Sequence, residues 1–199
     1  MTDDSVFWER LRQATGGFIS LTDEQVEKLA AHYRLLRKWN SKMNLTTITE
    51  LVEVVERHYA ESLFASVNLP EGTKSIADIG SGAGFPGLPI AISRPELSVC
   101  LIESNQRKAA FLREAAHSLA NIRVRAVRAA EFTEHVDCVV SRAVRWQDVL
   151  ALVPGHAERF ALMLAERDLA ALVGESRFRL AQSIRMPFGE SRLIAIGST

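Results

Sequence analysis

The feature that most constrains the fold is a glycine-rich segment that follows a short apolar run. Residues 75–87 read Ser-Ile-Ala-Asp-Ile-Gly-Ser-Gly-Ala-Gly-Phe-Pro-Gly. The apolar run at 76–79, interrupted by Asp78, predicts a buried strand, and Pro86 stands where a first helical turn would begin. Between them lie Gly80, Gly82 and Gly84, which can take positive φ and let a ligand approach the main chain. A strand, a glycine turn and a helix N-terminus together predict a binding turn of the nucleotide type.

Two details indicate which nucleotide this turn suits. Residues 82–87 satisfy the pattern G-x-G-x-x-G of dinucleotide-binding proteins, and Glu103 follows at the spacing of a ribose-binding acid. However, Asp78 stands just before the first glycine, where its charge would repel a pyrophosphate, and Gly80 adds a glycine two residues earlier. S-adenosylmethionine has no phosphate and carries a sulfonium cation and an amino acid end, so Asp78 suits it better than NAD. An NAD-dependent oxidoreductase stays the alternative from another enzyme class.

The segment 78–87 resembles the cofactor loop of a known family, the RsmG (GidB) methyltransferases of bacteria. Further matches lie on both sides of the loop: Trp39 with Asn40, Asn44-Leu45-Thr46, Arg57 with His58, Glu61-Ser62-Leu63, and Ser141-Arg142-Ala143. The resemblance covers residues 30–145. It implies a Rossmann-like class I methyltransferase sheet, S-adenosylmethionine as the methyl donor and N7 of a guanine in 16S ribosomal RNA as the acceptor. The implied partner is that RNA, the small ribosomal subunit or its precursor.

Composition agrees with an ordinary folded protein. The chain has 199 residues, of which 47% are hydrophobic, enough to bury a sizeable core. The 24 basic residues equal the 24 acidic ones, so total charge gives no nucleic-acid signal. Cys100 and Cys138 lie in apolar runs and are expected as buried thiols of a reducing compartment. Because no apolar run reaches membrane-spanning length and no signal-peptide pattern is present, we expect a cytoplasmic protein without a membrane partner. A monomer is also expected, although the sequence does not determine the oligomeric state.

The chain divides by pattern into a helical part and an alternating part. Residues 1–70 are predicted to form an N-terminal helical cap: Thr22 and Gln25 form a capping box, and a further helix covers about 51–66. From residue 75 onward, short apolar runs alternate with helical segments. Strands are expected at 76–79, 98–102, 122–127, 136–140, 160–165, 177–185 and 193–196, with helices at about 86–93 and 105–119.

This alternation predicts an α/β fold in which helices cover both faces of a parallel sheet. Residues 71–199 are predicted to form the S-adenosylmethionine-binding core, on which the cap 1–70 packs to make one compact unit. The last two strand-like runs are joined by Pro187-Phe188-Gly189-Glu190 and predict an antiparallel hairpin.

Candidate binding residues follow the predicted strands, because ligands of such sheets sit beyond the carboxyl ends, where strand order reverses. Asp78 is expected to bind the amino group of the cofactor or to brace the loop. Glu103, after the second strand, is expected to accept hydrogen bonds from both ribose hydroxyls, a helix cap being its alternative role. The loop residues expected at the cofactor are Gly80, Ser81, Gly82, Gly84 and Phe85.

The resemblance implies two further contacts. After the third strand, Ala129 and Ala130 flank the adenine, where small side chains leave room for a flat ring. After the fourth strand, Arg142 lies beside the glycine loop, at the boundary between cofactor and RNA, provided that strand order reverses between the first and fourth strands. An arginine that merely extends to solvent is the alternative.

The implied reaction accounts for the absence of an obvious nucleophile set. Guanine N7 has an in-plane lone pair and no hydrogen, so transfer to it needs no general base and depends on alignment. Arg142 is therefore expected to act by positioning, no metal site is predicted, and His58 is expected as a hydrogen-bonded helix histidine. The candidate RNA-binding residues, each with a solvated surface role as the alternative, are Arg123, Arg125, Arg128, Arg145 and Arg192.

Two departures from the family pattern concern the RNA side. The family usually carries a lysine near the end of the fifth strand, where this chain reads Ala161-Leu162-Met163-Leu164-Ala165. The family's Glu-Arg-x-Leu before the last strand appears here as Glu190-Ser191-Arg192-Leu193, and a shift of one position reverses the face on which a strand residue lies. An RNA-binding module that keeps the fold but has little turnover is therefore the non-enzymatic alternative.

Overall fold

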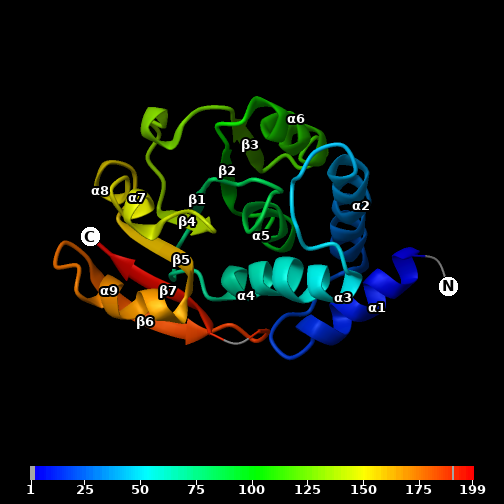
Figure 1. The fold of residues 1–199 in the computed structure, drawn as a ribbon, viewed down its shortest axis with the longest axis horizontal. Coiled ribbons are helices and arrows are strands. Elements are labelled where there is room, and N and C mark those ends of the chain that lie inside the picture. The colour runs from blue at the N-terminus through cyan, green and yellow to red at the C-terminus, as the bar shows by residue number, and fades with distance from the viewer. Residues whose placement is uncertain (1–2, 190) are drawn as a thin grey trace.

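The predicted apolar runs form strands in the computed structural model, which describes residues 3–189 and 191–199. The strands are β1 (Ser75–Ile79), β2 (Ser98–Ile102), β3 (Ile122–Arg125), β4 (Cys138–Arg142), β5 (Arg159–Ala165), β6 (Arg179–Arg185) and β7 (Arg192–Ser198). Within the described residues they make one seven-stranded sheet in the order β3-β2-β1-β4-β5-β7-β6 (Figure 1).

Strand directions follow the prediction. β1 to β5 are parallel, whereas β7 is antiparallel to both of its neighbours, β5 and β6. The parallel sheet and the C-terminal hairpin are therefore confirmed, although Glu190, at the end of the hairpin connection, lies outside the described residues. Strand order reverses between β1 and β4, which pair directly although β2 and β3 intervene in sequence. This is the switch point at which such sheets bind ligands.

Helices cover both faces of the sheet. Successive side chains of a strand point to opposite faces, so β1 and β2 each contribute to two apolar clusters. Ile76 and Val99 belong to one apolar cluster, which they share with α5 (Gly87–Ser93) and α6 (Gln106–Ala115). Ala77 and Ile79 belong to the other, with α7 (Trp146–Leu150), α8 (Val153–His156) and α9 (Leu169–Val173). Burial on both faces explains why these strands read as continuous apolar runs.

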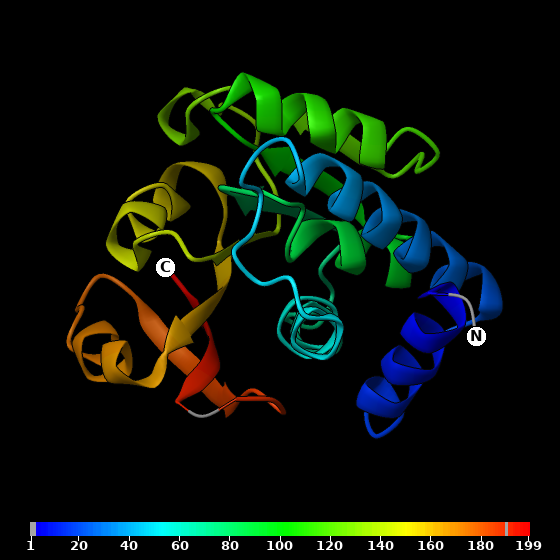
Figure 2. The same ribbon diagram turned by 45° about the vertical axis from the view of Figure 1, so that its right-hand side comes forward.

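The N-terminal helices pack on the α5 side of the sheet. α1 (Asp3–Thr15) and α2 (Asp23–Asn40) contribute Phe7, Leu11, Val26 and Leu29 to the same apolar cluster that contains Ile76. The capping box of Thr22 and Gln25 begins α2, as predicted. Figures 1 and 2 show α1 and α2 at the end of the molecule opposite to α7, α8 and α9. In the part of the chain that the structure describes, no helix combines the length and hydropathy needed to cross a bilayer.

The predicted helix over 51–66 contains a π-helical turn. α3 (Leu51–Val54), the π turn η1 (Val55–Ala60) and α4 (Glu61–Val67) follow one another without a break. Such turns are rare, and apolar spacing does not distinguish them from α-helix, so the sequence did not predict this one. Its position is informative, because π turns are frequent at functional sites.

Several predicted boundaries are wrong. β4 extends to Arg142, so Ser141 and Arg142 end the strand rather than follow it, and Ala143, with φ of 61°, turns the chain away. β3 stops at Arg125 and α6 at Ala115, and residues 16–22 and 41–50 interrupt the helical cap. The 3₁₀ turns η2 (Ala129–Glu131) and η3 (Glu166–Asp168) and the helices α7, α8 and α9 were not predicted, because three to five residues carry too little periodicity.

Candidate active site

The glycine turn after β1 is held by backbone hydrogen bonds and by close packing. The N–H groups of Gly80 and Ser81 both donate to the carbonyl of Ile102, at 2.9 and 3.1 Å, which ties the turn to the end of β2. Gly80 and Gly84 have φ of 75° and 90°, and a Cβ at these positions would collide with Val144 and with a leucine of α5 respectively. The turn therefore requires glycine at both positions and presents main chain rather than side chains.

A cavity of about 430 Å³ opens at the carboxyl ends of β1, β2 and β4. We call it the loop cavity. Of the predicted cofactor residues, Gly80, Ser81, Gly82, Phe85, Glu103 and Arg142 line it. Residues 44–48, His58, Ala83, Lys108, Ala143 and Val144 complete the lining. Its volume falls in the range of roughly 300–1,000 Å³ usual for small-molecule sites.

Part of this lining was not assigned to the site from the sequence. Lys108 of α6 and residues 44–48, in the loop after α2, reach the cavity from elements that the strand pattern does not connect with it. The resemblance included Asn44-Leu45-Thr46, which was the available signal for this loop. Conversely, Asp78, Gly84, Ala129 and Ala130 are not among the described residues that line the cavity, and their cofactor role stays a prediction.

Glu103 is held in place by main-chain donors on both carboxylate oxygens. Its Oε2 accepts from the N–H of Gly82 at 3.0 Å, and its Oε1 accepts from the N–H of Asn105 at 2.8 Å. The side chain is only slightly exposed, since the residue is 7% accessible. Each carboxylate oxygen has a further lone pair, so Glu103 can accept hydrogen bonds from two ligand hydroxyls without releasing the loop.

Asp78 contacts the protein rather than the loop cavity. The residue is fully buried, and its Oδ2 accepts from the N–H of Gly87 at 3.0 Å, at the start of α5. Burial raises the pKa of Asp78 to about 7. Of the two roles expected for Asp78, bracing the loop is the one that these contacts favour.

Arg142 lies between the sheet and the helical cap. Its guanidinium donates to the carbonyl of Arg57 at 2.5 Å and to Nδ1 of His58 at 2.6 Å, and it lies 4.0 Å from the Glu61 carboxylate. The side chain is 15% exposed, and burial lowers the pKa of Arg142 to about 10, so it keeps its charge at neutral pH. Both acceptors, the carbonyl of Arg57 and Nδ1 of His58, belong to η1, so the π turn fixes the guanidinium that the end of β4 supplies.

His58 is a neutral histidine with a defined tautomer. Because a guanidinium can only donate, Nδ1 of His58 must accept from Arg142, which leaves the proton on Nε2 to donate to Oγ1 of Thr46 at 2.8 Å. Burial, followed by the charge of Arg142, lowers the pKa of His58 to about 3. The ring also stacks on Phe85 of the glycine turn, with centroids 4.5 Å apart. The expectation of a hydrogen-bonded helix histidine is confirmed, but its partner was not foreseen.

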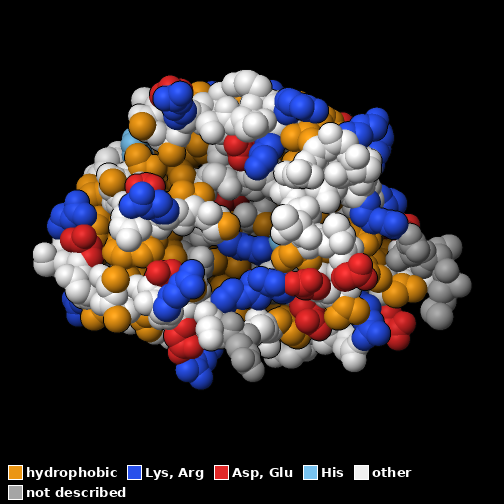
Figure 3. All heavy atoms as spheres, viewed as in Figure 1, with side chains coloured by type: hydrophobic (Ala, Val, Ile, Leu, Met, Phe, Trp, Pro, Cys, Tyr) orange, Lys and Arg blue, Asp and Glu red, His pale blue; other side chains and the backbone are white. Residues whose placement is uncertain are grey.

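A second cavity of about 230 Å³ shares Arg142 and Ala143 with the first. We call it the arginine cavity, because Arg57, Arg142 and Arg192 line it together with Glu61, residues 163–165, Met186 and Leu193. Lys and Arg side chains gather at the hollow in the middle of the face in Figure 3.

Arg192 reaches the arginine cavity despite its displacement in sequence. It forms an ion pair with Glu61, whose side chain is 2% exposed and whose pKa burial raises to about 7 against the opposing effect of the arginines. The residue before it, Ser191, has φ of 65° and so departs from extended strand geometry. Met163, Leu164 and Ala165 of β5, where the family usually has a lysine, bring no charge to this wall.

The other candidate RNA-binding arginines do not line either cavity. Arg123 and Arg125, on β3, form exposed ion pairs with Glu134. Arg145 lies 3.8 Å from Asp148, and Arg128 is exposed before η2. A role in RNA binding stays a prediction for these four residues.

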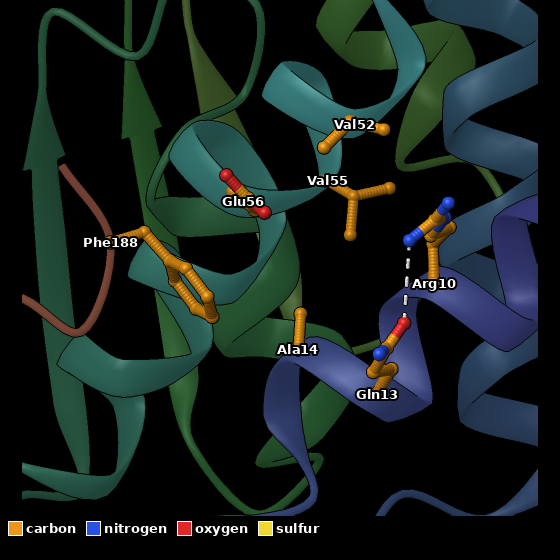
Figure 4. A pocket seen from close by; sticks show the side chains of 7 residues that line it. All are labelled: Arg10, Gln13, Ala14, Val52, Val55, Glu56 and Phe188. Atoms are coloured by element: carbon orange, nitrogen blue, oxygen red, sulfur yellow. Dashed lines mark hydrogen bonds between the residues drawn. The ribbon is translucent and has the colours of Figure 1, made fainter.

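A further hollow of about 190 Å³ lies apart from these two (Figure 4). Side chains of α1, α3 and η1 line it together with Phe188 from the β6–β7 connection, and Arg10 donates to Gln13 at its edge, at 3.4 Å. It contains none of the residues predicted to bind a ligand.

The neutral state of His58 predicts a specific pH dependence of stability. The pKa of His58 is about 3 in the folded protein against an ordinary 6.5, so between these values only the unfolded chain binds the proton. The contribution of neutral His58 to the free energy of unfolding is fully present above pH 6.5 and is lost as the pH falls from 6.5 to about 3. In His58→Asn, the slope of unfolding free energy against pH between about 4 and 6 should decrease by roughly 1.4 kcal/mol per pH unit.

Urea unfolding at a series of pH values measures this slope. The matched control is His117→Asn at an exposed position, which should leave the slope as in the parent chain. Equal slopes in the His58 variant and the parent would contradict the burial of a neutral imidazole.

Comparison with known proteins gives a family and a fold. Residues 25–166 match the family GidB, described as rRNA small subunit methyltransferase G. The ribosomal RNA small subunit methyltransferase G of Roseiflexus castenholzii is 42% identical over 167 residues, covering 83% of this chain and 64% of that protein. Its counterpart in Myxococcus xanthus is 38% identical, covering 81% and 82%. The chain thus spans less than two thirds of the first relative's length.

Solved structures agree at the level of the fold. A SAM-dependent methyltransferase from Aquifex aeolicus superposes with a TM-score of 0.57 at 14% identity, covering 73% of this chain and 92% of that chain. Aeropyrum pernix fibrillarin, solved with natively bound S-adenosyl-L-methionine, gives a TM-score of 0.55 at 14% identity, covering 69% and 73%. The sheet is therefore that of Rossmann-like class I methyltransferases, as predicted, and by its match over residues 25–166 the chain belongs to the family of rRNA small subunit methyltransferase G.

Proposed function

We propose that this protein binds S-adenosylmethionine in the loop cavity and methylates N7 of a guanine in 16S ribosomal RNA presented at the arginine cavity. The observation that carries the proposal is that Arg142 lines both cavities, so a donor in one and an acceptor in the other would meet at its guanidinium. Family membership supports the same reaction.

The residues of the loop cavity fit this cofactor. A Cβ at Gly82 would have only the carbonyl of Gly80 near it, at 3.7 Å, so main chain forms this part of the wall and a ligand can lie against it. Glu103 supplies acceptors for the two ribose hydroxyls, and Phe85 supplies an apolar surface. Asp78, behind the turn, keeps part of its charge at neutral pH, which disfavours the pyrophosphate of NAD, whereas Glu103 suits the ribose of either cofactor. When bound, the cofactor supplies a methyl group on a sulfonium cation.

The protein's own contribution to the reaction is alignment and charge. N7 carries no proton, so no residue has to act as a base, and the buried His58 is suited to orient Arg142 rather than to transfer protons. Arg57, Arg142 and Arg192 give the arginine cavity a positive lining for RNA phosphates, partly balanced by Glu61. A guanidinium also has the donor geometry to bind guanine O6, which leaves N7 free for transfer.

The test of this function is to map methylated guanines in ribosomal RNA from cells with and without the chain. We expect one N7-methylguanine in the small-subunit RNA to depend on the chain. An unchanged pattern, combined with binding of S-adenosylhomocysteine and RNA, would favour the RNA-binding module, for which the uncharged end of β5 is the motive. Binding of NADH in place of S-adenosylhomocysteine would favour the oxidoreductase.

Replacement of Arg142 by lysine should affect turnover strongly. A lysine ammonium cannot hold the planar two-sided contact with the carbonyl of Arg57 and Nδ1 of His58, so the charge would be present but misplaced. We expect incorporation of labelled methyl into small-subunit RNA to fall about 100-fold in Arg142→Lys, a typical cost of misalignment. Arg177→Lys, at an exposed site paired with Glu175, is the control. Full turnover in Arg142→Lys would remove Arg142 from the reaction.

Substitution of Gly82 should block the loop cavity without unfolding the chain. Gly82 has φ of 55°, which Asn and Asp tolerate better than other side chains, and space is available for a Cβ. In Gly82→Asp the added side chain occupies the cavity, and its charge faces Glu103, whose Oε2 lies 3.0 Å from the Gly82 nitrogen. Calorimetric titration should show at least about tenfold weaker binding of S-adenosylhomocysteine, a cost of roughly 1.4 kcal/mol or more.

Gly82→Asn separates bulk from charge in this experiment, because it has the same shape and backbone strain without the carboxylate. We expect it to bind more weakly than the parent but more tightly than Gly82→Asp. Parent-like affinity in a folded Gly82→Asp would show that the ligand does not lie against Gly82.

A further inference from the structure

A buried chain of hydrogen bonds connects the helical cap to the glycine turn. Nε2 of His32, on α2, lies 3.0 Å from the carbonyl of Ala83, and Nδ1 of His32 lies 2.9 Å from the hydroxyl of Tyr59, on η1. His32 is 3% exposed and Tyr59 is completely buried. The histidine ring is surrounded by Phe85, Phe111 and Tyr59, with centroid distances of 5.2 to 5.8 Å. These two polar side chains thus lie in an aromatic environment, and among the described residues their hydrogen bonds are to each other and to one loop carbonyl.

The two hydrogen bonds of His32 are compatible with only one placement of the ring proton. The carbonyl of Ala83 can only accept, so Nε2 of His32 must carry the proton. Burial lowers the pKa of His32 to about 4, so the ring is neutral at pH 7, and its unprotonated Nδ1 must accept from the Tyr59 hydroxyl. The Ala83 carbonyl therefore selects the tautomer of His32, and the Tyr59 hydroxyl, which can donate or accept, adapts to it by donating to Nδ1 and so holds the ring in place.

The loop peptide that His32 contacts is one that could otherwise rotate. Gly84, with φ of 90°, follows Ala83, and a glycine lets the peptide between them turn over at little steric cost. Two bonds oppose this rotation: the carbonyl of Ala83 accepts from His32, and the N–H of Gly84 donates to the carbonyl of Ser81 at 2.7 Å. Ala83 and Gly82 both line the loop cavity. The orientation of this peptide therefore sets the shape of the cavity wall.

We propose that His32, oriented by Tyr59, is a positioning residue for the cofactor: it holds the Ala83–Gly84 peptide so that the glycine turn keeps its binding shape. The helical cap is then a component of the cofactor site, although α2 is remote in sequence from the turn. This inference rests on the proposed binding of S-adenosylmethionine in the loop cavity. It assigns no chemical step to His32, which acts through the turn and does not line the loop cavity.

Two substitutions of His32 distinguish its hydrogen bond to Ala83 from its hydrogen bond to Tyr59. The amide nitrogen of glutamine can take the place of Nε2 and donate to Ala83, whereas asparagine is shorter and reaches only the place of Nδ1, facing Tyr59. Both remove the imidazole from the same aromatic environment, so they share the loss of packing. We expect calorimetric titration with S-adenosylhomocysteine to show about tenfold weaker binding for His32→Asn, consistent with loss of a buried hydrogen bond, and a change of less than about threefold for His32→Gln.

Kinetics and the tautomer give readouts that a general loss of stability would not change. In His32→Asn we expect the KM for S-adenosylmethionine to rise while kcat stays within about twofold, because the aligned complex, once formed, is unaltered. Nitrogen-15 correlation spectra of the parent chain should show His32 in the Nε2–H tautomer. Tyr59→Phe, which keeps the aromatic packing but removes the donor to Nδ1, should retain the Nε2–H tautomer because the Ala83 carbonyl still accepts, and should weaken S-adenosylhomocysteine binding about threefold because the ring is held less firmly.

The outcomes are separable. Equal affinities for His32→Asn and His32→Gln, or an Nδ1–H tautomer in the parent, would overturn the positioning role. If His32→Asn does not fold, Tyr59→Phe decides: parent-like affinity in this variant would overturn the proposal that Tyr59 orients His32 for cofactor binding. Absence of S-adenosylhomocysteine binding by the parent chain would instead contradict the proposed function, while the tautomer would still report on the contact between His32 and Ala83.

Discussion

The hydrogen bond between the Arg142 guanidinium and Nδ1 of His58 joins the sheet to the helical cap at the point where strand order reverses. A cation with 15% exposure is stable there because the imidazole is neutral and the carbonyl of Arg57 accepts a second hydrogen bond. The same imidazole stacks on Phe85 and bonds to Thr46, so one ring relates the arginine, the glycine turn and the loop after α2. This arrangement fixes Arg142, which lines both cavities and forms part of the wall between them.

The π turn supplies the residues on the cap side of this contact. It carries Arg57, His58 and Tyr59, and Glu61 follows it directly, so the side chains that meet Arg142, Arg192 and His32 come from one short segment. The cap also shares its apolar cluster with β1 and β2, so its position relative to the sheet is set by burial. Polar pairing at the π turn and apolar packing along α2 therefore act on the same interface.

The sequence predicted the parts of this arrangement that depend on local pattern. The strand ending at Ile79, the glycine turn and Glu103 after β2 follow from short motifs, whereas the reversal between β1 and β4 was expected only from the family resemblance. The π turn could not be predicted, because apolar spacing does not distinguish it from α-helix. The pairing of His58 with Arg142 could not be predicted, because it joins residues 84 positions apart. Arg192 shows the limit of strand alternation, because the positive φ of Ser191 lies just before it and strict periodicity assumes extended backbone.

A crystal structure of the chain with S-adenosylhomocysteine tests the central claim most directly, since it locates the ligand relative to both cavities. The account predicts the ribose hydroxyls at the Glu103 carboxylate, the ligand against Gly82, and the sulfur on the side of Arg142. A ligand bound in another hollow, or one whose sulfur points away from Arg142, would contradict it.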